Sequence, residues 1–234
     1  MENKKTVVAI VIVILLMAAL IAVSYFYNDF NTKQLALLTE EANKILESNL
    51  REYSIDFDIK TEKNYAEVEE AVKEYISKLK NIYVEIDEMV SGINPNVIFA
   101  AKNVPDKNLD EIENIINQYK EKCQNLIAEY EELITEEKIV ENINNADISV
   151  RNEYYINLYS EIMLSETMQN QYMDLEEEIK NEKASLYDKL NKIEKMKVFL
   201  EEHKDSWIIK EDKIHFTNVN RMTEYYSLFN QVID

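Results

Sequence analysis

The side chains that most often carry chemistry in proteins are scarce and scattered in this chain. Its 234 residues include two histidines, His203 and His215, and one cysteine, Cys123. Zinc sites use His and Cys ligands at short spacings such as HExxH, and neither histidine has such a partner. A lone cysteine cannot form an internal disulfide, and Cys123 falls at an apolar position of a helical repeat. We therefore expect Cys123 to be a buried core residue rather than a reactive thiol.

Paired acidic residues are the other candidates for acid/base catalysis or cation binding. They occur at Glu40-Glu41, Glu69-Glu70, Glu131-Glu132 and Glu176-Glu177-Glu178. Their helical context predicts that they point outward, and none lies in a DxDxDG loop of the calcium-binding type. The single glycine, Gly92, cannot supply a phosphate loop, a dinucleotide fingerprint or a nucleophile elbow. The sequence therefore predicts no enzymatic activity, no metal site and no cofactor.

Composition narrows the fold class. One Gly and two Pro are too few for a strand-rich domain, which needs turn residues every 8 to 12 positions. We therefore expect an all-α protein. The formal net charge of -19 disfavours nucleic acid and anionic lipid headgroups as partners, whereas it favours solubility, cations or a basic protein surface.

The N-terminal segment predicts a membrane anchor. Residues 6–27 form one uncharged, mostly apolar run, and about 20 such residues span a bilayer. Lys4 and Lys5 precede the run and Asp29 follows it, which favours a cytoplasmic tip at residues 1–5 and a body outside the cell membrane. The alternative is a cleaved signal peptide, because Ala22-Val23-Ser24 resembles a cleavage site, and the body would then be secreted.

Residues 28–205 are predicted to form an elongated antiparallel helical bundle. Two apolar seams alternate spacings of 3 and 4, as in a coiled coil, and they are expected to pack against each other. The first comprises Tyr65, Val68, Val72, Tyr75, Leu79, Ile82, Ile86 and Met89. The second comprises Leu109, Ile112, Ile116, Tyr119, Cys123, Leu126, Tyr130 and Leu133, and its helix is expected to continue to about Ile143.

The boundaries between the helices follow from breaks in this pattern. The helix after the anchor is expected to end near Tyr53 and to be followed by an extended or looped segment. Gly92, Pro95 and Pro105 predict that no helix crosses residues 91–108. A reversal is expected at residues 144–147, with Asp147 as a cap. Residues 148–204 could then form one helix, with a kink or a change of packing partner near residues 165–171.

Residues 206–234 differ in character from the bundle. They predict a hairpin, with strands at residues 207–209 and 214–216, and a final helix capped by Asn218 or Asn220. Specificity in a coiled-coil protein more often resides in such a non-repetitive part, although the same residues could simply close the bundle. The candidate partner-binding surface comprises Trp207, Ile209, His215, Phe216, Tyr225, Tyr226 and Phe229.

These features predict a membrane-anchored, extracytoplasmic helical bundle that acts as a structural or protein-interaction module. Its expected partners are membrane lipid through residues 6–27 and a protein of unknown identity, and a homo-oligomer stays open. The alternative is a sensory or ligand-binding ectodomain of the four-helix type. Only about five residues would remain inside the cell, so that alternative needs a partner subunit to supply the output.

Overall fold

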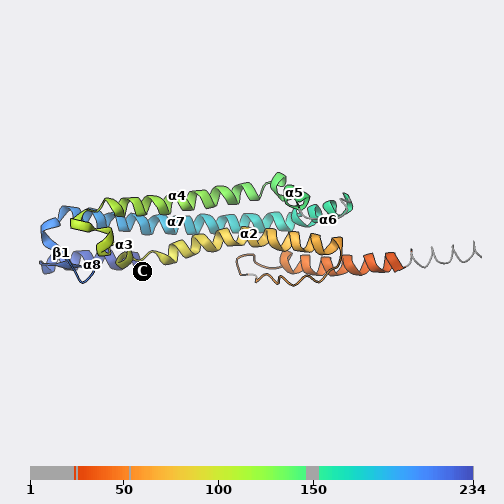
Figure 1. Ribbon diagram of the computed structural model, residues 1–234, viewed down its shortest axis with the longest axis horizontal. Helices are drawn as coiled ribbons and strands as arrows, with labels where there is room; N and C mark the ends of the chain where they lie inside the picture. The colour runs from red at the N-terminus through yellow and green to blue at the C-terminus, as the bar shows by residue number, and fades with distance from the viewer. Residues whose placement is uncertain (1–23, 25, 53, 146–152, 234) are drawn as a thin grey trace, which may run out of the picture. The chain divides into compact units, whose positions relative to one another are not determined.

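The computed structural model describes residues 24, 26–52, 54–145 and 153–233 (Figure 1). The described chain is mostly helical with one short pair of strands, which confirms the all-α prediction. It divides into two compact units. The first combines the chain up to Tyr75 with Val140–Ser165, and the second combines Ile76–Ile139 with Glu166–Asp234.

The predicted anchor lies almost entirely outside the described residues. The same is true of Ala146 and Asp147 in the expected reversal. Within the described ranges, no helix has both the length and the hydropathy needed to cross a bilayer. The anchor at residues 6–27 therefore stays a prediction.

The first unit is built from a helix at residues 26–46, the beginning of α2 (Asn64–Gly92), the end of α5 (Glu136–Asn145), and α6 (Glu153–Met163). Its first helix ends at residue 46, where the Ser48 hydroxyl donates to the Ile45 carbonyl at 2.7 Å, so the predicted extension to Tyr53 is too long. Residues 54–61 have no regular secondary structure, as expected. The buried apolar core of the unit includes Leu38, Ala42, Ile45, Tyr65, Val68, Val72, Tyr155 and Tyr159.

The second unit is organised around α4 (Asp110–Leu133) and α7 (Glu166–Glu202), which lie side by side in Figure 1. Three cross-helix contacts show that they are antiparallel, because residue numbers fall along α7 as they rise along α4. They are Glu113 with Lys197 at 3.0 Å, Gln124 with Tyr187 at 3.3 Å, and the Tyr130 hydroxyl with the Tyr172 carbonyl at 2.7 Å.

Both predicted seams are largely buried. Every residue of the first seam is buried, and in the second only Tyr119 and Leu133 are partly exposed. The expected pairing was wrong in one respect, since the main helical partner of α4 is α7 rather than α2. The periodicity identified which side chains are buried but could not identify the helix against which they pack.

Two helices that were expected to be long are interrupted. α4 ends at Leu133 and α5 begins at Glu136, so the predicted continuation to Ile143 was wrong. Between them, the Thr135 hydroxyl donates to the Glu132 carbonyl at 2.7 Å. Ser165 acts similarly between α6 and α7, donating to the Ile162 carbonyl at 2.8 Å. Such hydroxyls compete for backbone groups, which explains why the expected kink near residues 165–171 is a full break just before it.

As predicted, no helix crosses the segment after α2, which contains three short helical turns: α3 (Pro95–Ile98), η1 (Ala101–Asn103) and η2 (Pro105–Lys107). The Asn94 side chain caps α3 by accepting a hydrogen bond from the Asn96 amide at 2.9 Å. Ile98 and Phe99 are buried. The segment is therefore docked on the second unit rather than forming a solvated linker.

The chain ends with η3 (Lys204–Ser206), β1 (Trp207–Lys210), β2 (Lys213–Phe216) and α8 (Val219–Ile233). The strands pair antiparallel, with Trp207 opposite Phe216 and Lys210 opposite Lys213. Glu211 and Asp212 form the two-residue turn with φ of 51° and 61°, the left-handed values that a tight hairpin requires. The predicted hairpin and final helix are confirmed in outline.

Asn218 is the cap of α8. Its side-chain oxygen accepts hydrogen bonds from the amides of Asn220 at 2.9 Å and Arg221 at 3.2 Å. These are two of the amides that the first turn of a helix leaves without a partner. Of the two expected caps, Asn218 is therefore the correct one.

Candidate functional site

Trp207 holds the hairpin against the end of α7. Its side chain is fully buried, and its indole nitrogen donates to the Leu200 carbonyl at 2.9 Å. The Lys107 ammonium lies 5.3 Å from the centroid of the indole ring and donates to the Lys204 carbonyl at 2.6 Å. Trp207 is thus a structural anchor rather than an exposed contact residue.

An aromatic cluster continues from the hairpin into α7 and α8. The ring centroids of Phe216 and Tyr225 are 5.0 Å apart, and those of Phe199 and Phe216 are 6.2 Å apart. The His203 ring stacks on Phe199 at 4.6 Å. Burial raises the pKa of the Tyr225 phenol above its ordinary value. This cluster fixes α8 onto the second unit.

The structure does not bring the seven predicted contact residues to one exposed face. Trp207 and Tyr225 are buried, whereas His215 and Tyr226 are exposed. The other three, Ile209, Phe216 and Phe229, are partly exposed. The alternation of the strands explains the division, since Trp207, Ile209 and Phe216 point inward and His215 points outward.

A different set of side chains on α8 is exposed and apolar. Val219, Met222, Tyr226 and Ile233 are 71%, 38%, 48% and 56% exposed, and Phe229 is partly exposed. We call these five residues the α8 flank. Their spacings of 3, 4, 3 and 4 are those of a coiled-coil seam. Three of them, Val219, Met222 and Ile233, were not part of the predicted surface, although this spacing could have identified them.

The α8 flank is distinct from the face with which α8 packs on its own unit. That face is marked by the buried residues Tyr225 and Val232. At 3.6 residues per turn, the four exposed flank residues lie within about 60° of one another and roughly a quarter of a turn from the packed face. The apolar surface of α8 is thus wider than the surface that its own unit covers.

The α8 flank is also nearly free of charge. Between Val219 and Ile233 the only charged residues are Arg221 and Glu224, which form an ion pair at 2.6 Å. The polar side of the helix is formed by exposed uncharged residues that include Asn220, Ser227 and Gln231, and Thr223 and Asn230 border the α8 flank. In a chain of net charge -19, this helix is a segment without net charge.

A second, unpredicted feature is a buried cluster of charges in the first unit. Lys73 is 1% exposed, and its ammonium lies 2.6 Å from Glu69 Oε1 and 3.0 Å from Glu41 Oε2. It also donates to the Asp58 carbonyl at 2.9 Å. Lys44 pairs with the other oxygen of Glu41 at 2.5 Å. Glu41 and Glu69 were expected to point outward, and the structure shows that this expectation was wrong.

Glu69 fastens the loop that precedes α2. Its Oε2 accepts hydrogen bonds from the amide and the hydroxyl of Thr61 at 2.9 and 2.8 Å, and from the Lys60 amide at 3.0 Å. These donors belong to a segment without secondary structure, whose backbone would otherwise lack partners. The Glu69 carboxylate therefore supplies the hydrogen-bond acceptors for the backbone amides of residues 60–61.

The electrostatics of the cluster favour its charged forms. Burial alone would lower the pKa of the Lys73 ammonium, but hydrogen bonds to Glu69 and Glu41 outweigh burial and raise it. Burial alone would raise the pKa of the Glu41 carboxyl, but hydrogen bonds from Lys44 and Lys73 lower it. All three N–H bonds of Lys73 have acceptors, so it has no free proton or lone pair to offer a substrate. The cluster is suited to holding structure rather than to catalysis.

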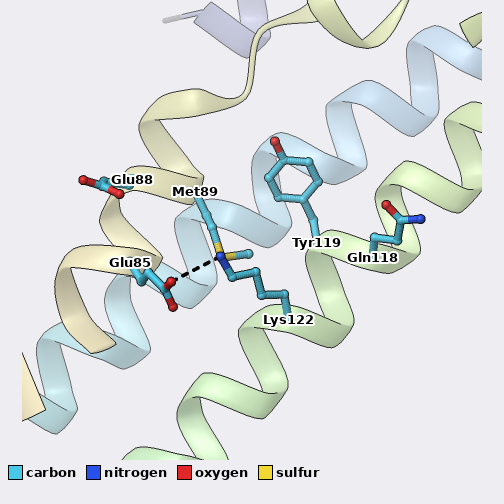
Figure 2. A pocket seen from close by; sticks show the side chains of 6 residues that line it. All are labelled: Glu85, Glu88, Met89, Gln118, Tyr119 and Lys122. Atoms are coloured by element: carbon cyan, nitrogen blue, oxygen red, sulfur yellow. Dashed lines mark ion pairs between the residues drawn. The ribbon is translucent and has the colours of Figure 1, made fainter. Parts of the chain in front are cut away.

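A shallow groove in the second unit lies between the later part of α2 and α4. It has a volume of about 390 Å³ and is lined by Glu85, Glu88, Met89, Gln118, Tyr119 and Lys122. Figure 2 shows the Lys122 side chain reaching across it toward Glu85, with which it pairs at 3.5 Å. About half of each of these two side chains is exposed. Their charges are therefore solvated, and the groove holds no buried acid or base.

Metal-binding chemistry has no support in the part of the chain that the structure describes. Within it, no group of three or more His, Cys, Asp or Glu side chains could hold an ion. Cys123 is fully buried, and burial raises the pKa of its thiol. These observations place Cys123 in the core, as the heptad pattern indicated.

No protein-family model, no curated protein and no solved structure matches this chain. Its role therefore has to be assigned from the chemistry of its own side chains. The features available for this are a helical scaffold, the buried charge cluster of the first unit and the exposed apolar α8 flank of the second unit.

Proposed function

We propose that this protein is a membrane-anchored, extracytoplasmic helical module that works through protein contacts and has no catalytic activity. The observation that carries the proposal is the α8 flank. Scattered single apolar residues are normal on a protein surface, but a contiguous apolar stripe is typical of an interaction site. The α8 flank places four exposed apolar side chains on one side of a single helix.

The membrane anchor rests on residues 6–27, whose length and lack of charge suit a bilayer. The described helix at residues 26–46 includes the last two residues of this run. Phe26 and Tyr27 are exposed, and aromatic rings favour the headgroup depth at which a spanning helix would leave the bilayer. Lys4 and Lys5 favour an inside position for the N-terminus and hence an outside position for the body.

A sensory or ligand-binding role is the second candidate, and one cavity favours it. The first unit has a cavity of about 510 Å³, within the usual size range of small-molecule pockets. It is lined by Tyr27, Phe30, Asn31, Lys63, Asn64, Glu67 and Tyr155. The Lys63 ammonium lies 4.4 Å from the centroid of the Phe30 ring. A ligand there would have to displace or share this contact.

Two measurements separate the candidates. For the anchor and its orientation, the full chain would be expressed with an N-terminal tag, and membranes would be washed with alkaline carbonate. We expect the chain to stay in the membrane pellet and protease added to intact cells to remove the body. Release by carbonate, or full protection from protease, would contradict the proposed location.

For the sensory alternative, the melting temperature of the full chain would be followed in detergent across a panel of small metabolites. A ligand that binds only the folded state at 100 times its Kd stabilises that state by about 2.7 kcal/mol. An increase that Tyr155→Ala abolishes would favour the sensory role. Unchanged melting throughout the panel would favour the interaction role.

A further inference from the structure

We propose that the α8 flanks of two copies of this chain pack against each other as an antiparallel helix pair. This inference deepens the proposed function, on which it rests, by naming the partner of the interaction surface. Three features of the α8 flank point to a second copy: its coiled-coil spacing, its high exposed fraction and its lack of charge.

The spacing selects a helix as the occupant. Apolar side chains that alternate spacings of 3 and 4 form knobs that fit the holes of a partner helix with the same repeat. The α8 flank has this repeat over its whole length, from Val219 to Ile233. Because α8 itself carries the matching repeat, a second copy offers the complementary surface without any further protein.

The charge distribution permits two copies to meet here. Elsewhere a chain of net charge -19 repels its own copies, since like charges placed together are unfavourable. On α8 the only charges, Arg221 and Glu224, already neutralise each other within one copy. The α8 flank is therefore a place where two acidic molecules can approach without bringing net charges together.

The direction follows from the same residues. An antiparallel pair centred between Tyr226 and Phe229 sets Tyr226 of one copy against Phe229 of the other, and Met222 against Ile233. A parallel pair would instead align the two helix dipoles unfavourably. The antiparallel register thus places the aromatic side chains at the centre of the pair and sets the two helix dipoles in opposite directions.

The contact is small, and the anchor compensates for that. α8 has 15 residues, which is a length of about 22 Å, so the pair falls below the roughly 1,200 Å² that stable complexes bury. Confinement to a membrane raises the effective concentration of one copy near another. This raises the fraction of paired molecules without adding any contact to the interface. We therefore expect pairing in membranes and dissociation in dilute detergent.

The test uses disulfide formation between full-length chains in their native membranes. Met222→Cys and Ile233→Cys are made in separate chains that carry N-terminal tags of different mass, and the two are expressed together and exposed to a mild oxidant. The antiparallel register brings these two positions together, within the reach of a disulfide. We expect mixed dimers in at least about tenfold excess over dimers from Met222→Cys expressed alone.

The matched control is Met173→Cys on α7. Met173 is also an exposed methionine, at 62%, and it lies outside the α8 flank. We expect few dimers from it under the same oxidation, and few from the unsubstituted chain because Cys123 is buried. Tyr226→Glu, added to both cysteine variants, should abolish the mixed dimer while far-UV circular dichroism of the purified chain stays unchanged.

Each result bears on a separate claim. Abundant dimers from Met222→Cys alone would overturn the antiparallel register, and mixed dimers no more abundant than those of Met173→Cys would overturn the pairing itself. If carbonate releases the chain, the anchor fails, and oxidation of the concentrated released protein still tests the pairing. Failure of the pairing is thereby distinguishable from failure of the membrane location.

Discussion

The Lys73 ammonium lies 2.6 Å from the Glu69 carboxylate, one helical turn away on α2, and both side chains are almost fully buried. With Glu41 they join the helix at residues 26–46, the loop at residues 58–61 and α2 within the first unit. An ion pair in this environment contributes little net stability when intact, because both charges have lost their water. Removing one residue of the pair is strongly destabilising, because the other charge is then left buried without a partner.

We therefore predict that Lys73→Met lowers the free energy of unfolding by about 3–5 kcal/mol, because Glu41 and Glu69 lose their shared cation inside the unit. Unfolding in urea followed by circular dichroism gives this value. The control is Lys33→Met in the same unit. Lys33 is 70% exposed in its pair with Asp29, so its loss should change the stability by less than about 1 kcal/mol. Equal effects of the two substitutions would contradict the role of the buried cluster.

The same cluster predicts a pH dependence. The folded-state pKa of Glu41 is lowered below 4.5, so its contribution to stability is present above about pH 4.5 and is lost as the pH falls further. The folded-state pKa of Lys73 is raised above 10.5, so its contribution is present below about pH 10.5 and is lost above it. Thermal melting at pH 3.5, 7 and 11 should show the highest melting temperature at pH 7.

Other carboxylates also titrate in acid, and a neutral variant separates their effect from that of the cluster. Glu41→Gln removes this titrating group, so the loss of stability between pH 7 and pH 3.5 should be smaller than in the unsubstituted chain. A loss of the same size would show that Glu41 does not contribute to the acid sensitivity.

Trp207 is the only tryptophan, so its fluorescence reports on the hairpin alone. We predict a blue-shifted emission that iodide quenches poorly, because the side chain is fully buried. Trp207→Phe removes the hydrogen bond to the Leu200 carbonyl and should lower the stability by about 1–3 kcal/mol. Red-shifted, readily quenched emission from the folded chain would contradict the docked hairpin.

Cys123 provides a test of the core of the second unit. Its thiol is buried and its pKa is raised, and only the exposed thiolate is nucleophilic. We predict that a maleimide reagent at pH 7.5 labels Cys123 only when denaturant unfolds the chain. Met173→Cys, with the added thiol on an exposed position of α7, should react at once under native conditions and serves as the positive control. Fast labelling of the unsubstituted native chain would contradict the packing described for α4.

The residues explain which features could be predicted from sequence. The alternating spacings of Val68, Val72, Tyr75 and Leu79 depend only on the geometry of one helix, so they correctly identified the buried face of α2. The main partner of α4 could not be identified in this way, because the apolar seam of one helix can pack against the apolar seam of any other helix. The break at Ser165 was predicted only as a kink or a change of packing partner, and the break at Thr135 was missed, although at both a hydroxyl residue is followed by Glu in the first helical turn, which is a sequence signal for a helix start.

The buried charges were missed for a different reason. Acidic residues are almost always exposed, so Glu41 and Glu69 were assigned to the surface. Two signals pointed the other way: Glu41 shares the core spacing of Leu38 and Ile45, and Glu69 precedes Lys73 by four residues beside a buried seam. The α8 flank was likewise visible as a repeat of 3 and 4, but residue type alone drew attention to Trp207 and Tyr225, which the unit buries.

The most direct measurement of the central claim is site-specific photo-crosslinking from α8 in the full chain in native membranes. A photoreactive amino acid is placed at Met222 on the α8 flank or at Gln231, an exposed residue on the opposite side of the helix. A flank that mediates protein contact should give a covalent protein adduct from Met222 and little from Gln231. Equal yields from both positions, or no adduct from Met222, would contradict the assignment of this flank as the interaction surface.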